Sequence, residues 1–249
     1  MIPAHIWTPW FSLFGGRSGF NSIEECFGDL SKHIVALETG LSADPKMIRL
    51  VSELDRFALI SNSDSHSPSN IGREATIFNA KFDYFGIRDS LINNSVRQTI
   101  EFFPEEGKYF ASGHRNCGYY LDPKTGSKGF CPICDKPLTQ GVMNRVNELA
   151  DRTIVPSTKQ ARFISTISLP DIISQVVKVG PKSKRVMRQY QKLINIFGSE
   201  FRILFDQSID DISNRYSPLI GKAIDNVRNG RVQIIPGFDG EYGKILLPE

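Results

Sequence analysis

Short apolar runs alternate with amphipathic segments along the N-terminal third of the chain. Three of these runs have the length of a buried strand, and polar side chains follow each of them: residues 1–4, 34–37 and 57–60. Continuous apolar runs separated by helical segments are typical of strands that a parallel sheet buries on both faces. Helices are predicted between the runs, from residue 23 to 33 behind a Ser22 cap and from Pro45 onward behind Asp44. The pattern predicts an α/β fold.

The polar side chains at the ends of these runs are candidates for a metal centre. His5 and Glu38 directly follow the first two runs, and Asp64 and His66 lie shortly after the third. Because active sites of β/α barrels and open α/β sheets lie at the carboxyl ends of the strands, the four side chains are expected to converge. A single His or Glu in such a place is usually structural, whereas Asp64 and His66 can face the same side of an extended segment. Imidazole and carboxylate donors suit zinc, manganese, magnesium or iron, and hydrolysis of phosphate esters.

A second group of metal-binding residue types lies in the middle of the chain. His114 and Cys117 are separated by two residues, and so are Cys131 and Cys134. Two residues between paired ligands let a tight turn direct both side chains at one tetrahedral ion, so the spacing predicts a structural zinc site. A disulfide is the alternative, which the intracellular character of the chain disfavours. Asp135 stands where such a turn often has glycine.

Composition adds little, because 30 basic and 27 acidic residues leave a net charge of +3. Nucleic-acid affinity therefore requires local clustering of charge. One cluster exists, since no acidic residue lies between Ile172 and Ser199 while six cations do. Lys178 is the first of them, and the other five are the candidates for phosphate contact: Lys182, Lys184, Arg185, Arg188 and Lys192. These side chains either form an ordinary solvated helix face or contact a phosphate backbone.

Two further features concern partners and location. Phe238 and Tyr242 lie on a glycine-rich turn near the C-terminus, where they can stack on a displaced base or cover the core. No apolar run approaches the length of a membrane-spanning helix, and three of the four cysteines belong to the metal motif. We expect a cytoplasmic protein without a membrane partner.

The motifs taken together resemble the endonuclease Q family, PHP-domain DNA repair nucleases with an inserted zinc-binding domain. The resemblance rests on the zinc motif and on six further segments: residues 2–11, 36–42, 59–68, 71–75, 99–109 and 236–243. It implies a metal-dependent endonuclease that nicks duplex DNA 5′ to uracil, hypoxanthine, xanthine or abasic sites. His5, Asp64 and His66 are then expected to bind the catalytic ions, with Glu38 as a ligand or water-orienting base. Arg73 is expected to hold a phosphate.

One departure from the family pattern concerns the start of the barrel. A PHP barrel is expected to open with a His-x-His motif and several further strands, and no His-x-His occurs in this sequence. About half of the barrel is then expected to be missing. The chain is interpreted as a fragment or the product of a misplaced start, or else as a split protein completed by a separate chain. Its activity alone is expected to be weak or absent.

The sequence thus predicts three regions. Residues 1–100 are expected to form a partial PHP-type barrel, residues 101–155 a zinc-binding domain and residues 156–249 a mainly helical region that contacts DNA. Two other functions stay open. The chain can be a non-catalytic, zinc-containing DNA-binding protein, or a PHP phosphatase that acts on small phosphate esters.

Overall fold

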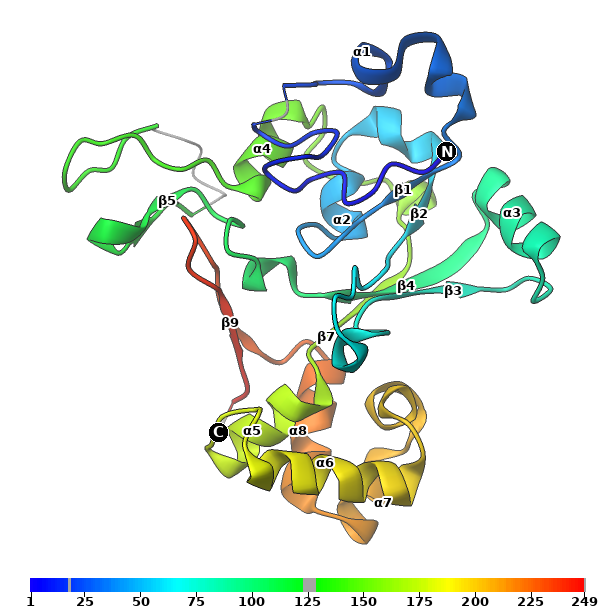
Figure 1. The fold of residues 1–249 in the computed structure, drawn as a ribbon, viewed down its shortest axis with the longest axis vertical. Coiled ribbons are helices and arrows are strands. Elements are labelled where there is room, and N and C mark those ends of the chain that lie inside the picture. The colour runs from blue at the N-terminus through cyan, green and yellow to red at the C-terminus, as the bar shows by residue number, and fades with distance from the viewer. Residues whose placement is uncertain (18, 123–128, 249) are drawn as a thin grey trace. The chain divides into compact units, whose positions relative to one another are not determined.

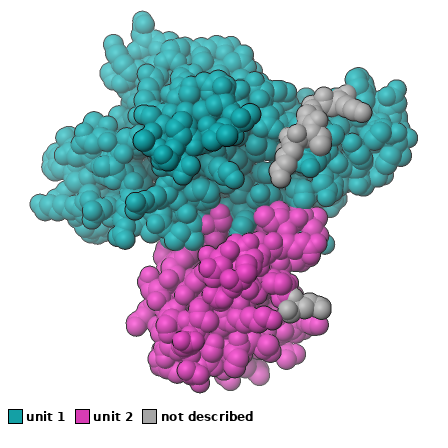
Figure 2. All heavy atoms as spheres, turned by 180° about the vertical axis from the view of Figure 1, so that it is seen from behind, with its two compact units in different colours: residues 1–164, 236–244 teal, residues 165–235, 245–249 magenta. Residues whose placement is uncertain are grey.

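The computed structural model describes residues 1–17, 19–122 and 129–248 (Figure 1). The chain divides into two compact units (Figure 2). Unit 1 comprises residues 1–164 and 236–244, and unit 2 comprises residues 165–235 and 245–249. Both are built from small sheets and short helices, so the predicted α/β class is confirmed at that level.

Unit 1 begins with two short parallel strands, as the apolar runs predicted. The elements in chain order are α1 (Ile23–Phe27), η1 (Gly28–His33), β1 (Ala36–Glu38), α2 (Pro45–Ile48), η2 (Ser52–Arg56) and β2 (Ala58–Ile60). β1 and β2 pair in parallel, with Glu38 opposite Ile60. Ser22 and Asp44 cap α1 and α2 through their side chains, as expected. Both helices are shorter than predicted. α1 continues as the 3₁₀ turn η1, since Gly28 takes a φ of +49° directly after it, and three residues separate α2, which ends at Ile48, from η2.

The first apolar run is not a regular strand, although it lies along β1. The backbone N–H of Val35 donates to the carbonyl of Met1 at 3.2 Å, and that of Glu38 donates to the carbonyl of Pro3 at 3.3 Å. Residues 1–4 themselves are exposed or half-buried, so the prediction of a buried strand is wrong for this run. The residues that follow it share one buried cluster with β1, β2 and the helices around them, which includes Ile6, Trp7, Phe14, Leu37, Ile48, Leu54 and Leu59. This core fixes the edge at which β1 and β2 end.

An antiparallel hairpin follows β2. Its elements are η3 (Pro68–Asn70), β3 (Ala75–Phe78), α3 (Tyr84–Ile92) and β4 (Val96–Phe102), with α3 between the two strands (Figure 1). β3 and β4 form a three-stranded sheet with β7 (Phe163–Thr166), in the order β3-β4-β7. The Ser61 hydroxyl donates to the carbonyl of Ile100 at 3.2 Å, so the end of β2 lies against β4.

The middle of unit 1 carries the metal motif. It contains η4 (Pro104–Glu106), β5 (Gly113–His114), η5 (Arg115–Cys117), β6 (Tyr119–Tyr120), α4 (Val142–Leu149) and η6 (Ser157–Lys159). β5 and β6 pair antiparallel, with His114 opposite Tyr119. Val142 and Val146 of α4 pack in the same core as β1 and β2. The metal motif is therefore anchored to the body of unit 1.

Unit 2 is mainly helical, as predicted for the C-terminal region. Its elements are α5 (Leu169–Val177), α6 (Lys184–Phe197), the π-helical turn η7 (Arg202–Asp206), α7 (Ile209–Arg215), α8 (Pro218–Arg228), β8 (Gln233–Ile235) and β9 (Lys244–Leu246). The Arg228 guanidinium donates to the carbonyls of Ile203, Leu204 and Gln207, which satisfies backbone acceptors around η7. Within the described residues, no helix is long and apolar enough to cross a bilayer.

Candidate functional site

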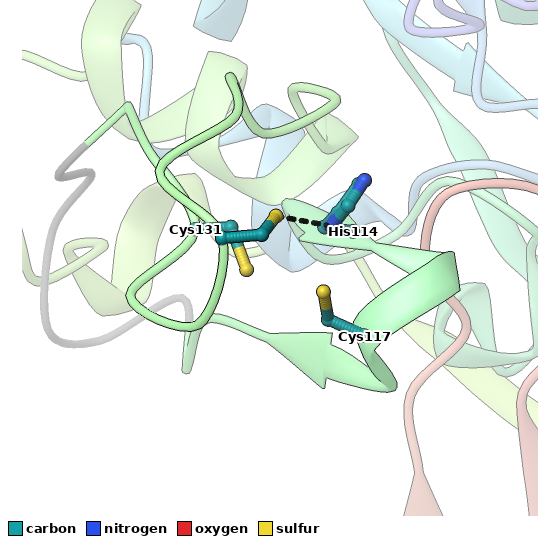
Figure 3. Close-up of side chains that lie close together, drawn as sticks. His114, Cys117 and Cys131 are labelled. Atoms are coloured by element: carbon teal, nitrogen blue, oxygen red, sulfur yellow. Dashed lines mark hydrogen bonds between the residues drawn. The ribbon is translucent and has the colours of Figure 1, made fainter.

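The four residues of the metal motif converge. One ligand atom from each of His114, Cys117, Cys131 and Cys134 lies within 4.8 Å of all the others. Figure 3 labels three of these side chains, His114, Cys117 and Cys131, which lie close together. His114 Nδ1 is 3.4 Å from the Cys134 sulfur. All the thiols are free, so the disulfide alternative is not realised. One imidazole and three thiols at this separation suit a tetrahedral metal ion such as zinc.

The two halves of this cluster are built by equivalent turns. A residue in the left-handed region follows the second ligand of each pair, Gly118 with a φ of +59° and Asp135 with a φ of +57°. The N–H of Gly118 donates to the carbonyl of Arg115 at 2.9 Å, and that of Asp135 to the carbonyl of Cys131 at 2.8 Å. Asp is one of the few residues other than glycine that visit this region. Its presence therefore leaves the turn intact.

Two thiols of the cluster have pKa values that are shifted in opposite directions. The Cys134 thiol, which lies beside Cys117, raises the pKa of Cys117 to about 11, together with burial. The pKa of Cys131 is lowered to about 7, because backbone N–H groups and the His114 imidazole outweigh the effect of burial. Three thiols this close cannot all ionise without a counter-charge. A divalent cation supplies that charge, so the donor set fits a metal.

At the second candidate site, the structure brings His5 and Glu38 together. Glu38 ends β1, and its Oε2 accepts a hydrogen bond from the backbone N–H of His5 at 2.7 Å. Its Oε1 accepts from the side-chain amide of Asn62 at 2.9 Å. The His5 ring lies 3.3 Å from the Thr8 hydroxyl, measured at Nδ1. The two carboxylate oxygens of Glu38 thus hold, through hydrogen bonds, the segment at His5 and the segment that follows β2 at Asn62.

Asp64 and His66 lie beyond the end of β2 and are both exposed. His66 Nδ1 is 2.8 Å from the carbonyl oxygen of Asp64, and Asp64 has a φ of +44°. In the part of the chain that the structure describes, the His114 cluster is the one group of three or more His, Cys, Asp or Glu that could share an ion. The structure therefore brings His5 and Glu38 together at the end of β1, while Asp64 and His66 contact each other and do not join them in a group of three or more that could share an ion.

Two buried carboxyl groups lie near the ends of β1 and β2, and no pattern in the sequence indicated them. Glu101 of β4 is fully buried and accepts hydrogen bonds from the hydroxyls of Ser61 at 2.8 Å and Thr39 at 3.0 Å. Glu74, 3% exposed, accepts from the backbone N–H of Phe102 at 3.1 Å. Burial raises the pKa of Glu101 to about 9 and that of Glu74 to about 7. Both carboxyl groups are therefore protonated in part or in full near neutral pH.

A hollow of about 520 Å³ opens beside His5. Aromatic side chains form much of its wall, namely Trp10, Phe11, Phe20 and Phe27. Phe11 is 97% exposed, although it belongs to an apolar segment in which Leu13 and Phe14 are buried. An exposed aromatic beside a potential metal ligand is a suitable surface for a displaced base.

The remaining candidates of unit 1, Arg73, Phe238 and Tyr242, differ in how accessible their side chains are. The Arg73 guanidinium lies 5.9 Å from the centre of the Phe102 ring, and its Nε has no acceptor among the described residues. Phe238 packs against the core and lies 5.2 Å from the Tyr120 ring, measured between ring centres. Tyr242 is 71% exposed and stacks under the Lys108 ammonium at 4.5 Å. Tyr242 is thus accessible to a ligand, while Phe238 has a structural contact.

The basic cluster of unit 2 lies on and before α6. Val186, Leu193 and Phe197 form the buried side of this helix. All five predicted cations are exposed: Lys182, Lys184, Arg185, Arg188 and Lys192. Among the described residues, none of the ion pairs formed by the chain uses any of the five. The cluster is available to an anionic partner.

Comparisons with known proteins support the resemblance seen in the sequence. A family model described as the MJ0043 C-terminal domain matches residues 168–231. The chain is 32% identical to the MJ0043 protein of Methanocaldococcus jannaschii, over 96% of this chain and 31% of the relative. It is 33% identical to the YqxK protein of Bacillus subtilis, over 98% of this chain and 60% of the relative. The chain therefore spans about a third to three fifths of these relatives.

Two crystal structures are similar to the whole chain. The lesion-specific endonuclease PfuEndoQ from Pyrococcus furiosus matches with a TM-score of 0.89 and 31% identity, over 100% of this chain and 62% of that one. An endonuclease Q complex with a 27-mer duplex substrate, which has an abasic lesion at the active site, matches with a TM-score of 0.84 and 31% identity. This match covers 100% of this chain and 63% of that one. The predicted resemblance to the endonuclease Q family is confirmed.

Proposed function

We propose that this chain forms the metal-binding and DNA-contacting part of an endonuclease that nicks damaged DNA. The cut would lie on the 5′ side of deaminated bases such as uracil, hypoxanthine or xanthine, or of abasic sites. The observation that carries the proposal is similarity to endonuclease Q structures over the whole chain, combined with metal-binding residue types at one edge of the β1–β2 sheet. Residues 1–100 would then be part of a PHP-type barrel.

The roles proposed for the edge residues follow from their positions. His5, Asp64 and His66 would bind catalytic ions, and Glu38 would act as a ligand or hold the attacking water. A divalent zinc, manganese or magnesium ion supplies a hydroxide near neutral pH and polarises the phosphoryl oxygen. Because this chain covers about three fifths of the endonuclease Q structures, the further ligands would come from the portion that those proteins have in addition.

The other sites would bind the substrate or stabilise the fold. The cluster of His114, Cys117, Cys131 and Cys134 would bind a structural zinc. Arg73 and the α6 cations would contact phosphates, because cations along a helix neutralise the DNA backbone without reading its sequence. The exposed rings beside His5 and the Tyr242 turn, with Phe238, would contact the displaced nucleotide. Residues 101–155 and 156–249 would thus be the zinc-binding and DNA-contacting regions.

A non-catalytic DNA-binding protein is the second candidate. It is favoured by the edge residues, which do not close into a metal site within the described part of the chain. In this case the zinc cluster and α6 would bind DNA, while the β1–β2 edge would only support the fold.

An assay of lesion selectivity separates the two candidates. Labelled duplexes with one uracil, one hypoxanthine, one abasic site or no lesion are incubated with the chain and Mn²⁺ or Zn²⁺. The chain is tested alone and mixed with the portion of YqxK outside the aligned region. Nicking of the damaged strands, weak alone and stronger in the mixture, supports the endonuclease. If the chain binds DNA but does not nick it, either alone or in the mixture and with either metal, the result supports the non-catalytic protein.

A further inference from the structure

A polar cavity of about 440 Å³ lies in unit 1, and none of His5, Glu38, Asp64 and His66 lines it. The nuclease edge follows β2 at Asn62 and Asp64, whereas the cavity is lined by the first residues of β4, from Val96 to Thr99, and by the segment 158–162 before β7. Its volume is within the usual range of roughly 300–1,000 Å³ for ligand pockets. The cavity belongs to none of the sites described above.

The charge of the lining is strongly unbalanced. Four cationic residues contribute to it, Arg49, Arg97, Lys159 and Arg162, against one acidic residue, Asp55. Asp55 is already neutralised, because its two oxygens accept from the Arg152 guanidinium at 2.9 and 2.5 Å. Clefts lined by one sign of charge concentrate ions of the opposite sign. The cavity therefore attracts anions.

The cations on its rim are free to bind such an anion. Arg97, Lys159 and Arg162 are exposed, and none of the ion pairs among the described residues includes them. Arg97 and Arg162 come from neighbouring strands, since the backbone N–H of Thr99 donates to the carbonyl of Arg162 at 3.1 Å. Guanidinium groups present a planar set of N–H donors that matches phosphate oxygens.

Arg49 gives the cavity a buried cation without a carboxylate of its own. It is 4% exposed, and its guanidinium donates to the carbonyls of Leu54 and Phe57, while its Nε has no acceptor among the described residues. Burial lowers the pKa of Arg49; the charge of the nearby Asp55 opposes this effect, and Arg152 adds to it. A buried charge normally requires a partner. An anion in the cavity would provide it.

We infer that this cavity is a binding site for a phosphate group, held by Arg97, Lys159 and Arg162 above the buried Arg49. The phosphate belongs either to a free anion or to the end of a nucleotide. The inference does not depend on the nuclease activity, because none of the four proposed nuclease residues lines the cavity.

Calorimetric titration of the whole chain tests this inference with three probes: inorganic phosphate, thymidine 5′-monophosphate and thymidine. Both phosphates are expected to bind saturably and thymidine not to bind. Tighter binding of the nucleotide would assign the site to a nucleotide end, and equal binding to a free phosphate. The Arg97→Gln/Arg162→Gln variant is expected to bind the phosphates at least about tenfold more weakly, since charged hydrogen bonds contribute about 1.5–3 kcal/mol each.

A matched control removes the same charge elsewhere. Lys32→Gln/Lys46→Gln, at two exposed positions outside the cavity, is expected to leave phosphate binding unchanged. Thermal unfolding of each variant checks that the fold is intact. Absence of saturable phosphate binding to the parent chain would overturn the inference. Equal weakening in this control would also overturn it, because binding would then follow net charge instead of the cavity.

Discussion

The Oε2 atom of Glu38 accepts a hydrogen bond from the backbone N–H of His5 at 2.7 Å, across 33 positions of sequence. This contact ties the segment before the core to the end of β1. Glu38→Gln keeps an acceptor at this place, whereas Glu38→Ala removes it and leaves the N–H without this partner. Loss of one partner of a half-buried hydrogen bond costs about 1–3 kcal/mol. We expect urea unfolding to show that loss for Glu38→Ala and a smaller one for Glu38→Gln. Equal losses would show that the hydrogen bond is not what Glu38 contributes.

The His114 cluster is expected to hold one zinc ion per chain. Elemental analysis after purification under reducing conditions should give about one equivalent, and Cys117→Ser should reduce it severely, because a thiolate ligand is lost. Cys26→Ser is the matched control, since Cys26 lies outside the cluster. Less than about half an equivalent in the parent chain, with no effect of Cys117→Ser, would exclude this site.

The turn residue Asp135 gives a more specific test of the same site. Its φ of +57° favours glycine, so Asp135→Gly should keep full zinc content and leave stability equal or slightly higher, by up to about 1 kcal/mol. Gly118→Ala in the equivalent turn should have the opposite effect, because alanine must adopt a φ of +59°. Zinc-dependent melting temperatures measure both. A stabilising Gly118→Ala would contradict the equivalence of the two turns.

Stability is expected to fall as pH rises from about 4.5 to 9. The folded-state pKa values of Glu74 and Glu101, about 7 and about 9, exceed the ordinary value of 4.5. In this window the unfolded chain has released protons that the folded chain still holds, so a higher pH favours unfolding. Urea unfolding at intervals across the window measures this slope. Glu101→Gln, which cannot ionise, should flatten it, while the exposed Glu148→Gln should not. An unchanged slope for Glu101→Gln would mean that Glu101 ionises freely in the folded chain.

The α6 cluster is expected to contribute to DNA affinity without lesion preference. Replacing Lys184, Arg185 and Arg188 with Ala should weaken binding to damaged and intact duplexes by similar factors. The logarithmic salt slope should fall by roughly two to three, since each lost phosphate contact removes about one unit. Gln191→Ala/Asn195→Ala changes the same helix without changing charge and should have no effect. Unaltered binding and salt dependence in the triple variant would assign α6 to an ordinary solvated face.

The sequence was informative where one local signal decides the structure. The apolar runs predicted β1 and β2, Ser22 and Asp44 predicted the helix starts, and ligand spacing predicted the convergence at His114. These features depend on neighbouring residues or on short turns, so they can be recognised in the amino-acid sequence alone.

Other features depend on contacts between distant segments. Glu101 was not predicted as a buried carboxyl, because Ser61 and Thr39, which donate to its Oε2 atom, lie 40 and 62 positions away. The cavity beside Arg49 likewise combines segments from three parts of unit 1. The exposure of Trp10 and Phe11 could have been suspected only from a dense aromatic segment next to His5. Such juxtapositions arise from tertiary packing, which no local pattern encodes.

The most direct test of the proposed endonuclease is the position of the cut and its dependence on Asp64. A 5′-labelled duplex with one abasic site is incubated with Mn²⁺ and the chain, mixed with the portion of YqxK that it does not cover. The account predicts a single nick on the 5′ side of the lesion, lost in Asp64→Ala at unchanged DNA affinity and retained in the exposed control Asp210→Ala. A nick that persists in Asp64→Ala, or cuts that ignore the lesion, would contradict it.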